Sequence, residues 1–427
     1  MESREIRADV DYEDTYVQPL LLEALQSKLP PEILALVKDA SELPSRKSRV
    51  LQWRQYESID FDRLMEDPTT TLANSYVIRK ALIRKHYLST TVSHWLSKHP
   101  DSVLRDHVKP SVEFEVDYAE FLEDALVEAY ELKESWARNE ALDEGAEGRE
   151  WWILKPGMSD RGQGIRLFST EEELQSIFEE WDPPSDDEED DVASQPDADG
   201  KQSGNGNGVI ASQLRHFIAQ PYVTSPLLMP PPHPSAGRKF HIRTYVLAVG
   251  ALKVYVYRPM LALFAGPIYK GPSAMAAPNE ELSSHLTNTC LQTGEREGSV
   301  HSFWSLPASG IDGLGNEWKE NVFGQICSVT GEIFEAAARS MSIHFQPLPN
   351  AFELYGIDFL VDAHGTAWLL EVNAFPDFAQ TGDELQGMVK NLFKETVEVG
   401  IKPFFGLNCE TSTGDMKQVL DIDLGKR

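Results

Sequence analysis

The stretch from Phe352 to Gln380, FELYGIDFLVDAHGTAWLLEVNAFPDFAQ, constrains the fold more than any other part of the chain. Two short apolar runs flank a His-Gly pair, and this pattern predicts two strands joined by a turn. Asp358 interrupts the first run, and Glu371 and Asn373 interrupt the second. Residues two apart on a strand share a face, so Glu371 and Asn373 point the same way, and a hairpin partner can bring Asp358 beside them.

Carboxylates and an amide inside apolar strands raise the free energy of the folded state unless a cation or a hydrogen-bond donor meets them. Oxygen ligands of this kind suit Mg²⁺, which binds one or two carboxylates and completes its shell with waters and nucleotide phosphates. The segment therefore predicts a magnesium site made of Asp358, Glu371 and Asn373. A hairpin whose acids simply face solvent is the alternative that the pattern leaves open.

A second informative stretch is WWILKPGMSDRGQGIRLF, from Trp151 to Phe168. A short strand delivers Lys155, a Gly-rich loop follows, and the chain returns into a second strand. Glycines let a backbone approach a polyphosphate and offer it N–H groups, while Lys155 and Arg161 can add positive charge. The order of strand, lysine, loop and strand differs from a P-loop and from a dinucleotide fingerprint. An ordinary loop remains the local alternative.

Alternating residues in RKFHIRTYVLAVGALKVYVYR predict a hairpin with a polar inner face. His241, Arg243 and Tyr245 share that face, Lys239 is in step with them, and the return strand brings back Arg258. Two arginines and a lysine there form a candidate clamp for phosphate or carboxylate. Half-exposed strands often carry such charges without a ligand, so the pattern alone decides neither way.

Two shorter segments are informative only in context. FIAQPYV predicts a strand whose end, Gln220 to Val223, can present backbone N–H and C=O groups to an adenine edge, or can be an ordinary strand end. In HLTNTCLQ, Thr287 and Asn288 are small polar residues of a predicted loop.

Helical spacing predicts helices in LLLEALQSKL, PEILALVKDA and VIRKALIRKHYL, from Tyr118 to about Ala137, over 322–342, and in ELQGMVKNLFKETVEVG. In VIRKALIRKHYL, Arg84 and Lys85 are interpreted as a solvated basic face. A polar, frayed tail is expected from about Cys409.

Length and composition limit the class of protein. A chain of 427 residues suggests two or three domains, and 41% apolar residues is a globular value. Three cysteines lie far apart without metal-site spacing, and the chain opens on polar residues, so a cytoplasmic location is expected. The net charge of −29 opposes direct binding of nucleic acid.

Residues 182–208 carry nine acids against one lysine and are predicted to be a disordered insertion within a domain. The insertion accounts for −8 of the net charge, which leaves −21 for the rest of the chain.

Taken in order, the blocks VIRKALIRK, WILKP…RGQGI, AQPYV, RKFHIRTYVL, VYVYR, HLTNTCLQ and YGIDFLVD…WLLEVNAFPD resemble the tubulin–tyrosine ligase family, a branch of the ATP-grasp ligases. The resemblance spans roughly Asn74 to Val399. The sequences RKFHIRTYVL and HLTNTCLQ are most similar to those of a fungal branch, typified by the ligase-like half of a yeast protein associated with mRNA-processing bodies.

The resemblance implies an α/β (α+β) fold of the ATP-grasp type, with ATP held between the last two domains. The implied boundaries are an N-terminal domain at 1–110, a central domain at 111–235 that contains the insertion, a C-terminal domain at 236–408 and a tail at 409–427.

By position, the resemblance implies roles for each block. Lysines reach the phosphates, the strand end meets adenine, the clamp holds nucleotide and substrate, and the acids bind Mg²⁺. The implied residues are Lys80, Lys155, Arg161, Gly162, Gln163, Gly164, Gln220, Pro221, Tyr222, Val223, Lys239, His241, Thr287 and Asn288 for ATP, Arg243 and Arg258 for catalysis, and Asp358, Glu371 and Asn373 for the metal.

Two features depart from the family pattern. The family usually has an acid where this chain has His241, which puts substrate identity in question more than ATP binding. The acidic body is the second departure, because the surfaces of the tubulin modifiers are basic and an acidic surface repels an acidic tubulin tail.

The implied activity is ATP- and Mg²⁺-dependent addition of an amino acid to a protein or peptide through an acyl phosphate. An alternative is a ligase-like, nucleotide-binding adaptor, with or without ligase activity, in a cytoplasmic mRNA-decapping or P-body assembly. A third is carboxylate–amine ligation on a small molecule.

Overall fold

The computed structural model describes residues 5–38, 48–142, 148–157, 163–182, 215–272, 278–287, 299–381, 385–409 and 414–424. The site candidates Arg161, Gly162 and Asn288 lie outside these residues, as does the predicted insertion after Asp182. The chain divides into two compact units. The first comprises Met1–Lys109, Ser225–Tyr269 and Ser283–Arg427, and the second comprises Pro110–Thr224 and Lys270–Leu282. The three-domain division stays a prediction.

The first unit opens with a small parallel sheet of order β2-β1-β3-β4. Its elements are β1 (Ile6–Asp11), α1 (Val17–Lys28), β2 (Leu34–Val37), β3 (Arg49–Arg54), α2 (Phe61–Glu66) and β4 (Thr71–Ala73). The predicted helix in PEILALVKDA is wrong, because a turn at 31–33 leaves a short apolar run that pairs with β1 as β2. Parallel pairing in the sheet outweighs the weak helical propensity of this segment.

The large sheet of the first unit is antiparallel and centred on β9 (Phe240–Val249). Along one edge β9 pairs with β13, which pairs with β14; along the other edge it pairs with β11 and then β10. The bounds are β10 (Lys253–Tyr257), β11 (Leu261–Phe264), β12 (Val300–Ser302), β13 (Phe352–Val361), β14 (Ala367–Ala374) and β15 (Met416–Asp421). The predicted hairpin is therefore confirmed as β13 and β14.

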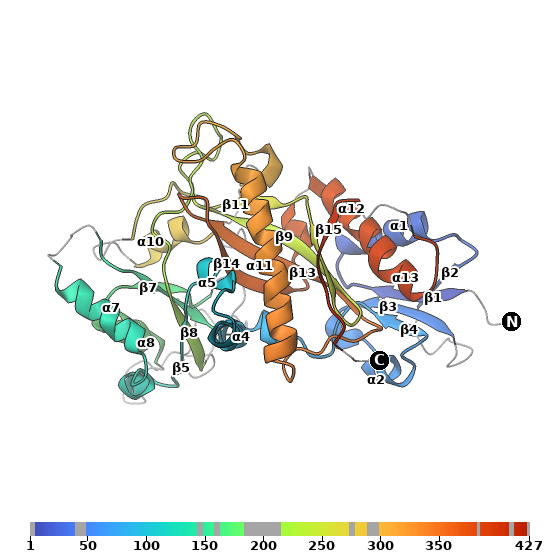
Figure 1. Cartoon of the computed structure of the whole chain (residues 1–427), viewed down its shortest axis with the longest axis horizontal. Helices are drawn as coiled ribbons and strands as arrows, with labels where there is room; N and C mark the ends of the chain where they lie inside the picture. The colour runs from blue at the N-terminus through green and yellow to red at the C-terminus, as the bar shows by residue number, and fades with distance from the viewer. Residues whose placement is uncertain are drawn as a thin grey trace, which may run out of the picture. The chain divides into compact units, whose positions relative to one another are not determined.

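Helices cover both faces of this sheet. Figure 1 shows the long helix α11 lying across one face, where its buried residues share a core with residues of β9, β13 and α4. On the opposite face, α1 and α12 share a second core with alternate residues of β9 and β13. The remaining helices of the first unit are α3 (Lys80–Ile83), α4 (Lys85–Lys98), α5 (Leu104–His107), α11 (Trp318–Ser340), α12 (Gln386–Thr396) and α13 (Lys402–Phe404). Helix α10 (Pro278–His285) is divided between the two units.

The C-terminal segment also differs from the sequence expectation. Instead of a frayed tail it contributes β15, which pairs antiparallel with β10 at the edge of the large sheet. Met416 is buried while most of the following residues are exposed or half-exposed, so the pairing rests mainly on backbone hydrogen bonds. Polar composition alone does not reveal such an edge strand.

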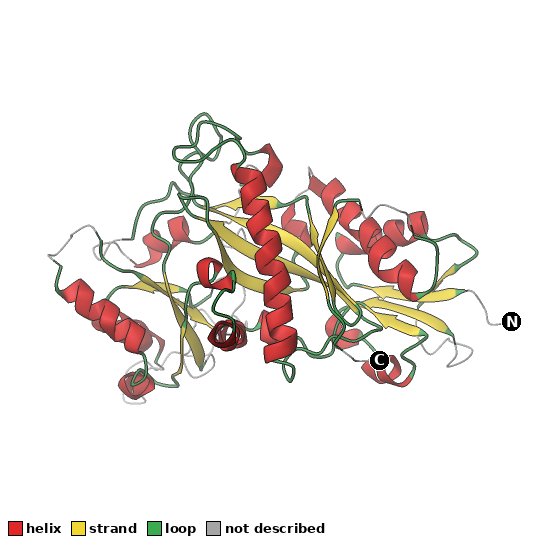
Figure 2. Ribbon diagram, viewed as in Figure 1, coloured by secondary structure: helices red, strands yellow, loops and turns green. Residues whose placement is uncertain are grey.

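The second unit is built on a four-stranded antiparallel sheet of order β5-β8-β6-β7, drawn in yellow with its red helices in Figure 2. Its elements are β5 (Val112–Glu115), α6 (Leu122–Ala125), α7 (Tyr130–Glu140), β6 (Trp152–Pro156), β7 (Arg166–Phe168), α8 (Glu171–Trp181) and β8 (His216–Pro221). A capping box between Thr170 and Glu173 starts α8. The helix predicted from Tyr118 to about Ala137 is not continuous, because a 3-10 turn (Ala119–Phe121) and the short helix α6 precede α7.

In the part of the chain that the structure describes, no helix combines the length and the apolar character needed to span a bilayer.

Candidate functional site

Three charged residues form one row across neighbouring strands of the large sheet. Arg243 of β9 lies opposite Asp358 of β13, which lies opposite Glu371 of β14. Arg243 donates to both oxygens of Asp358, from Nε to Oδ1 at 2.5 Å and from Nη2 to Oδ2 at 3.0 Å. Both side chains are less than a tenth exposed. Burial acts to lower the pKa of Arg243, and Asp358 outweighs it, so this pKa is raised overall and the guanidinium stays charged.

Asn373 joins the two carboxylates of the row. Its Nδ2 donates to Glu371 Oε1 at 3.1 Å and lies 3.5 Å from Asp358 Oδ2. The second oxygen of Glu371 forms an ion pair with Lys85 Nζ at 3.2 Å. The predicted convergence of Asp358, Glu371 and Asn373 is thus confirmed as geometry, with one cation beside each carboxylate.

A β-bulge sets the direction of Glu371. Asp358 pairs with Glu371, but the next residue, Phe359, pairs with Leu369, so Leu370 is the extra residue of β14. The extra residue lets Leu369 and Val372 both enter the core under α11 while Glu371 points to the opposite face. Without the bulge, strict alternation would place Glu371 and Leu369 on one face.

Gly356 provides the space that Arg243 needs. A Cβ at this position would lie 3.2 Å from Arg243 Cδ and 2.9 Å from Pro376 Cβ. The glycine therefore lets the arginine side chain cross β13 toward Asp358. The sequence offers no signal for this role, because a glycine inside a strand also marks bulges and bends.

A separate group of predicted residues lies in the second unit. Lys155, at 7% exposure, donates from Nζ to Gln220 Oε1 at 2.8 Å, and Gln220 Nε2 donates to Ser111 Oγ at 2.6 Å. The pairing of β6 with β8 therefore brings the strand lysine to the first residue of the predicted adenine-binding segment. Tyr222 N donates to Trp151 O at 2.7 Å, which fixes the end of that segment.

The remaining candidates of the second unit lie at the end of the Gly-rich loop and of β8. Gln163 is exposed, and Gly164 has a φ of +72°, a conformation that favours glycine. Pro221 and Val223 are half-buried at the end of β8.

Comparison with known proteins decides the family. A profile of the tubulin–tyrosine ligase family matches residues 64–409. A probable tubulin–tyrosine ligase of Schizosaccharomyces pombe is 44% identical over 409 residues, which cover 94% of this chain and 93% of that protein. The chain belongs to the tubulin–tyrosine ligase family.

Two further relatives narrow the branch. The probable tubulin–tyrosine ligase PBY1 of Saccharomyces cerevisiae is 43% identical over 92% of this chain, which spans about half (51%) of that protein. A crystal structure of the C-terminal domain of Kluyveromyces lactis Pby1, described as an ATP-grasp enzyme interacting with the mRNA decapping enzyme Dcp2, matches with a TM-score of 0.71 and 34% identity. The aligned residues cover 98% of this chain and 99% of that domain. The predicted ATP-grasp fold and resemblance to the fungal branch are confirmed, and the expected class of enzyme in this family is an ATP-dependent ligase.

In this tubulin–tyrosine ligase family member, the basic segment VIRKALIRKHYL does not have the structure that the sequence predicts. Lys85 is not part of a solvated face, because the chain is extended at Arg84 (φ −102°, ψ 121°) and α4 starts afresh at Lys85. The break interrupts helical spacing and turns Lys85 toward Glu371. Lys80 is exposed at the start of α3, and its contact with phosphate stays a prediction.

Arg258 does not share the face of Arg243, so the predicted clamp of two arginines is wrong. Val256 lies opposite Val246, and both face the core under α11; Arg258, two residues on, continues on that side. Its Nη2 pairs with Glu320 Oε1 of α11 at 2.5 Å, and its guanidinium stacks 4.2 Å from the centre of the Trp304 ring. Alternation along β9 does not determine which face Arg258 takes, because the turn between β9 and β10 can change the alternation.

His241, the departure from the family's acid, is buried beside the row. Its Nδ1 lies 2.5 Å from Thr287 Oγ1, and its Nε2 lies 3.7 Å from Asp358 Oδ1, beyond hydrogen-bond distance. Burial lowers the pKa of His241 below its ordinary value of 6.5, although Asp358 opposes the shift, so the ring is neutral near pH 7. Lys239, two residues earlier on the same face, is also buried.

A second buried ion pair lies on β13, and the sequence pattern missed it. Glu353 is 1% exposed and pairs with Arg79, Oε1 to Nε, at 2.9 Å. Its Oε2 accepts hydrogen bonds from the Tyr355 hydroxyl at 2.8 Å and from Tyr76 N at 3.2 Å. The Arg79 guanidinium also lies 3.8 Å from the centre of the Tyr56 ring.

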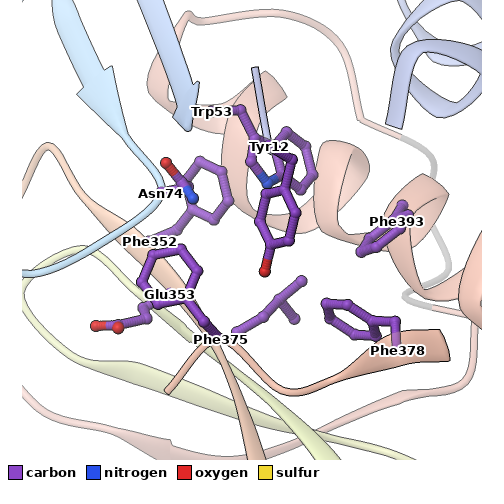
Figure 3. A pocket seen from close by; sticks show the side chains of 9 residues that line it. Tyr12, Trp53, Asn74, Phe352, Glu353, Phe375, Phe378 and Phe393 are labelled. Atoms are coloured by element: carbon purple, nitrogen blue, oxygen red, sulfur yellow. The ribbon is translucent and has the colours of Figure 1, made fainter. Parts of the chain in front are cut away.

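Next to this pair, aromatic rings line a small pocket of 10 Å³, about the space of one water molecule (Figure 3). The residues that line it are Tyr12, Trp53, Asn74, Phe352, Glu353, Leu354, Phe375, Phe378 and Phe393. Burial raises the pKa of Glu353 from 4.5 to about 7, with Arg79 opposing the shift. A carboxyl group in this setting changes charge near neutral pH.

The raised pKa of Glu353 predicts a specific pH dependence of stability. The protonated form is favoured in the folded chain, so stability from this group is present below pH 4.5 and is lost as the pH rises through about 7. The difference in unfolding free energy between Glu353→Gln and the parent chain should shift in favour of the variant by about 1–3 kcal/mol as the pH rises from 5 to 8, because only the parent loses this stability. Urea unfolding at several pH values measures the difference.

Glu134→Gln is the matched control, because Glu134 is 75% exposed on α7. A pH profile of Glu353→Gln that runs parallel to those of the parent and the control would contradict the assignment.

Proposed function

We propose that the chain is an ATP- and Mg²⁺-dependent carboxylate–amine ligase that adds an amino acid to a protein or peptide. One observation carries the proposal. In a member of the tubulin–tyrosine ligase family, Asp358, Glu371 and Asn373 converge on one face of two paired strands, next to Arg243.

The donor set fits Mg²⁺. Two carboxylates and an amide supply hard oxygen ligands, and the ion completes its shell with waters and phosphate oxygens. Among the described residues, no group of three or more His, Cys, Asp and Glu side chains could hold a metal ion. The metal site that we propose is made of the two carboxylates of Asp358 and Glu371 together with Asn373. When bound, Mg²⁺ would neutralise charge that develops on the transferred phosphate.

The second unit supports the nucleotide part of the proposal. Lys155 is held by Gln220 at the end of an apolar strand, where its ammonium group is partly removed from water and fixed in direction. We propose that it contacts the α- and β-phosphates, and that the backbone of residues 220–223 contacts adenine. Such fixed donors act on charge without further reorganisation.

The chemistry that we propose needs no side-chain nucleophile. A substrate carboxylate attacks the γ-phosphate, ADP leaves, and an acyl phosphate forms; an amine then attacks the acyl carbon, and phosphate leaves with formation of the amide. Holding both reactants in place can lower the barrier by about 7 kcal/mol or more. Arg243 donates to both oxygens of Asp358 and so fixes the direction of this carboxylate.

A specific observation favours a second candidate function. The matching domain of Kluyveromyces lactis Pby1 is described as interacting with the decapping enzyme Dcp2. A protein of the decapping machinery is therefore a candidate partner, and a cytoplasmic P-body is the candidate location. In this alternative the fold acts as a nucleotide-binding adaptor. The neutral His241 can then replace the family's acid because the adaptor does not need catalytic turnover.

Binding of Mg·ATP tests the nucleotide site. At a ligand concentration of about 100 times Kd, binding to the folded state adds about 2.7 kcal/mol to the unfolding free energy, which raises Tm by a few degrees. We expect this shift in the parent chain and its loss in Lys155→Met, as measured by thermal unfolding with and without Mg·ATP. Lys133→Met is the matched control, because Lys133 is an exposed lysine of the same unit.

Turnover separates the candidates. ADP release that depends on an added amino acid and a peptide acceptor supports protein modification, and release with a small carboxylate and a small amine in the absence of a peptide supports small-molecule ligation. A Tm shift without turnover on any acceptor, together with capture of Dcp2, supports the adaptor. Absence of any Tm shift in the parent chain contradicts the nucleotide site itself.

A further inference from the structure

Lys85 occupies a position at the metal-ligand set that the sequence did not assign. Its Nζ lies 3.2 Å from Glu371 Oε2, and the two side chains are 15% and 25% exposed. Glu371 Oε1 accepts a hydrogen bond from Asn373 Nδ2, and Lys85 pairs with the other oxygen, Oε2. Arg243 and Lys85 together balance the two carboxylates of the row.

The backbone that carries Lys85 is firmly held. The ring of Tyr87 stacks on His344 with centroids 4.3 Å apart, and Leu88 is buried in the core. Thr91 of α4 donates to Ala81 O at 3.2 Å, which ties α4 to the preceding turn. Movement of Lys85 is therefore confined to its long side chain.

An ammonium group and a divalent cation compete for Glu371. Mg²⁺ contacts its oxygen ligands at about 2.0–2.1 Å, and a Lys85 ammonium at its present place would then face a double positive charge at close range. The ammonium group must turn away when the metal enters, and it needs another anion. Mg²⁺ enters such sites together with nucleotide phosphates, which supply that anion.

We propose that Lys85 couples metal binding to nucleotide binding: it holds the place of the metal at Glu371 and, when the metal enters, transfers to a phosphate oxygen of ATP. This inference rests on the proposed function. Lys85 weakens binding of the metal alone and strengthens binding of the metal together with the nucleotide. The two halves of the effect have opposite signs, which distinguishes coupling from simple structural support.

Lys85→Met tests the coupling through two binding measurements. Mn²⁺ serves as the metal probe, and its free concentration is followed by electron paramagnetic resonance without and with ATP. We expect the variant to bind Mn²⁺ alone about threefold to tenfold more tightly than the parent, since a competing charge is removed. We expect it to bind Mn·ATP about tenfold more weakly, since one charged hydrogen bond to phosphate is lost.

Two control variants make the result specific. Arg84→Met removes the neighbouring cation and should leave both affinities unchanged, whereas Lys85→Arg keeps a cation and should keep the parent's preference for Mn·ATP over Mn²⁺ alone. Equal changes of both affinities in Lys85→Met, or no change in either, would overturn the coupling. A parent chain that binds neither Mn²⁺ nor Mn·ATP would overturn the proposed function as well.

Discussion

Replacing Glu371 with glutamine is expected to weaken binding of Mg·ATP by about 100-fold or more. The substitution keeps the shape of the side chain but removes one of two carboxylates that face the same space, and a neutral amide is a much weaker ligand for a hard cation. It also removes the anion that pairs with Lys85. Isothermal titration calorimetry with Mg·ATP measures the loss.

Glu353→Gln is the matched control for this experiment. Glu353 is a buried glutamate of the same hairpin, on β13, but its contacts go to Arg79, Tyr355 and Tyr76 rather than to the proposed metal ligands. We expect this control to bind Mg·ATP like the parent chain. Unchanged affinity in Glu371→Gln would refute the metal assignment, and equal losses in both variants would indicate general damage to the hairpin.

The hairpin that carries these residues could be predicted from the sequence because its signals are local. Two apolar runs around a His-Gly turn fix antiparallel pairing, and a spacing of two fixes the common face of Glu371 and Asn373. The order of seven short blocks was enough to indicate the family and the ATP-grasp fold, and both are confirmed.

Other features depend on packing between segments that lie far apart in the sequence, and local periodicity does not predict such packing. The break before α4 turns Lys85 toward Glu371. The position of Arg258 after a turn decides that it meets Glu320 on the face of α11. The partner of Arg79 is a glutamate far along the chain, which nothing local in the sequence indicates.

Arg243→Met is expected to reduce the free energy of unfolding by about 3–5 kcal/mol, because it leaves the buried carboxylate of Asp358 without its guanidinium. Asp358 and Arg243 are both less than a tenth exposed, so water cannot replace the lost partner. Arg258→Met is the matched control: its ion pair with Glu320 is about 40% exposed or more on each side, and such pairs contribute about 0–1 kcal/mol. Urea unfolding of the two variants measures the difference.

Mg²⁺ should partly reverse the effect of Arg243→Met if the proposed metal site is correct. A divalent cation bound to Asp358 and Glu371 supplies the positive charge that the variant lacks, so excess Mg²⁺ should raise its unfolding free energy more than that of the parent, and a chelator should remove the gain. Asp358→Asn in the Arg243→Met background removes the unpaired charge and should recover stability but not the response to Mg²⁺. Equal stability of Arg243→Met and Arg258→Met would show that the buried row does not stabilise the sheet. A loss that Mg²⁺ leaves unchanged would show that Asp358 stabilises the sheet through Arg243 without binding the metal.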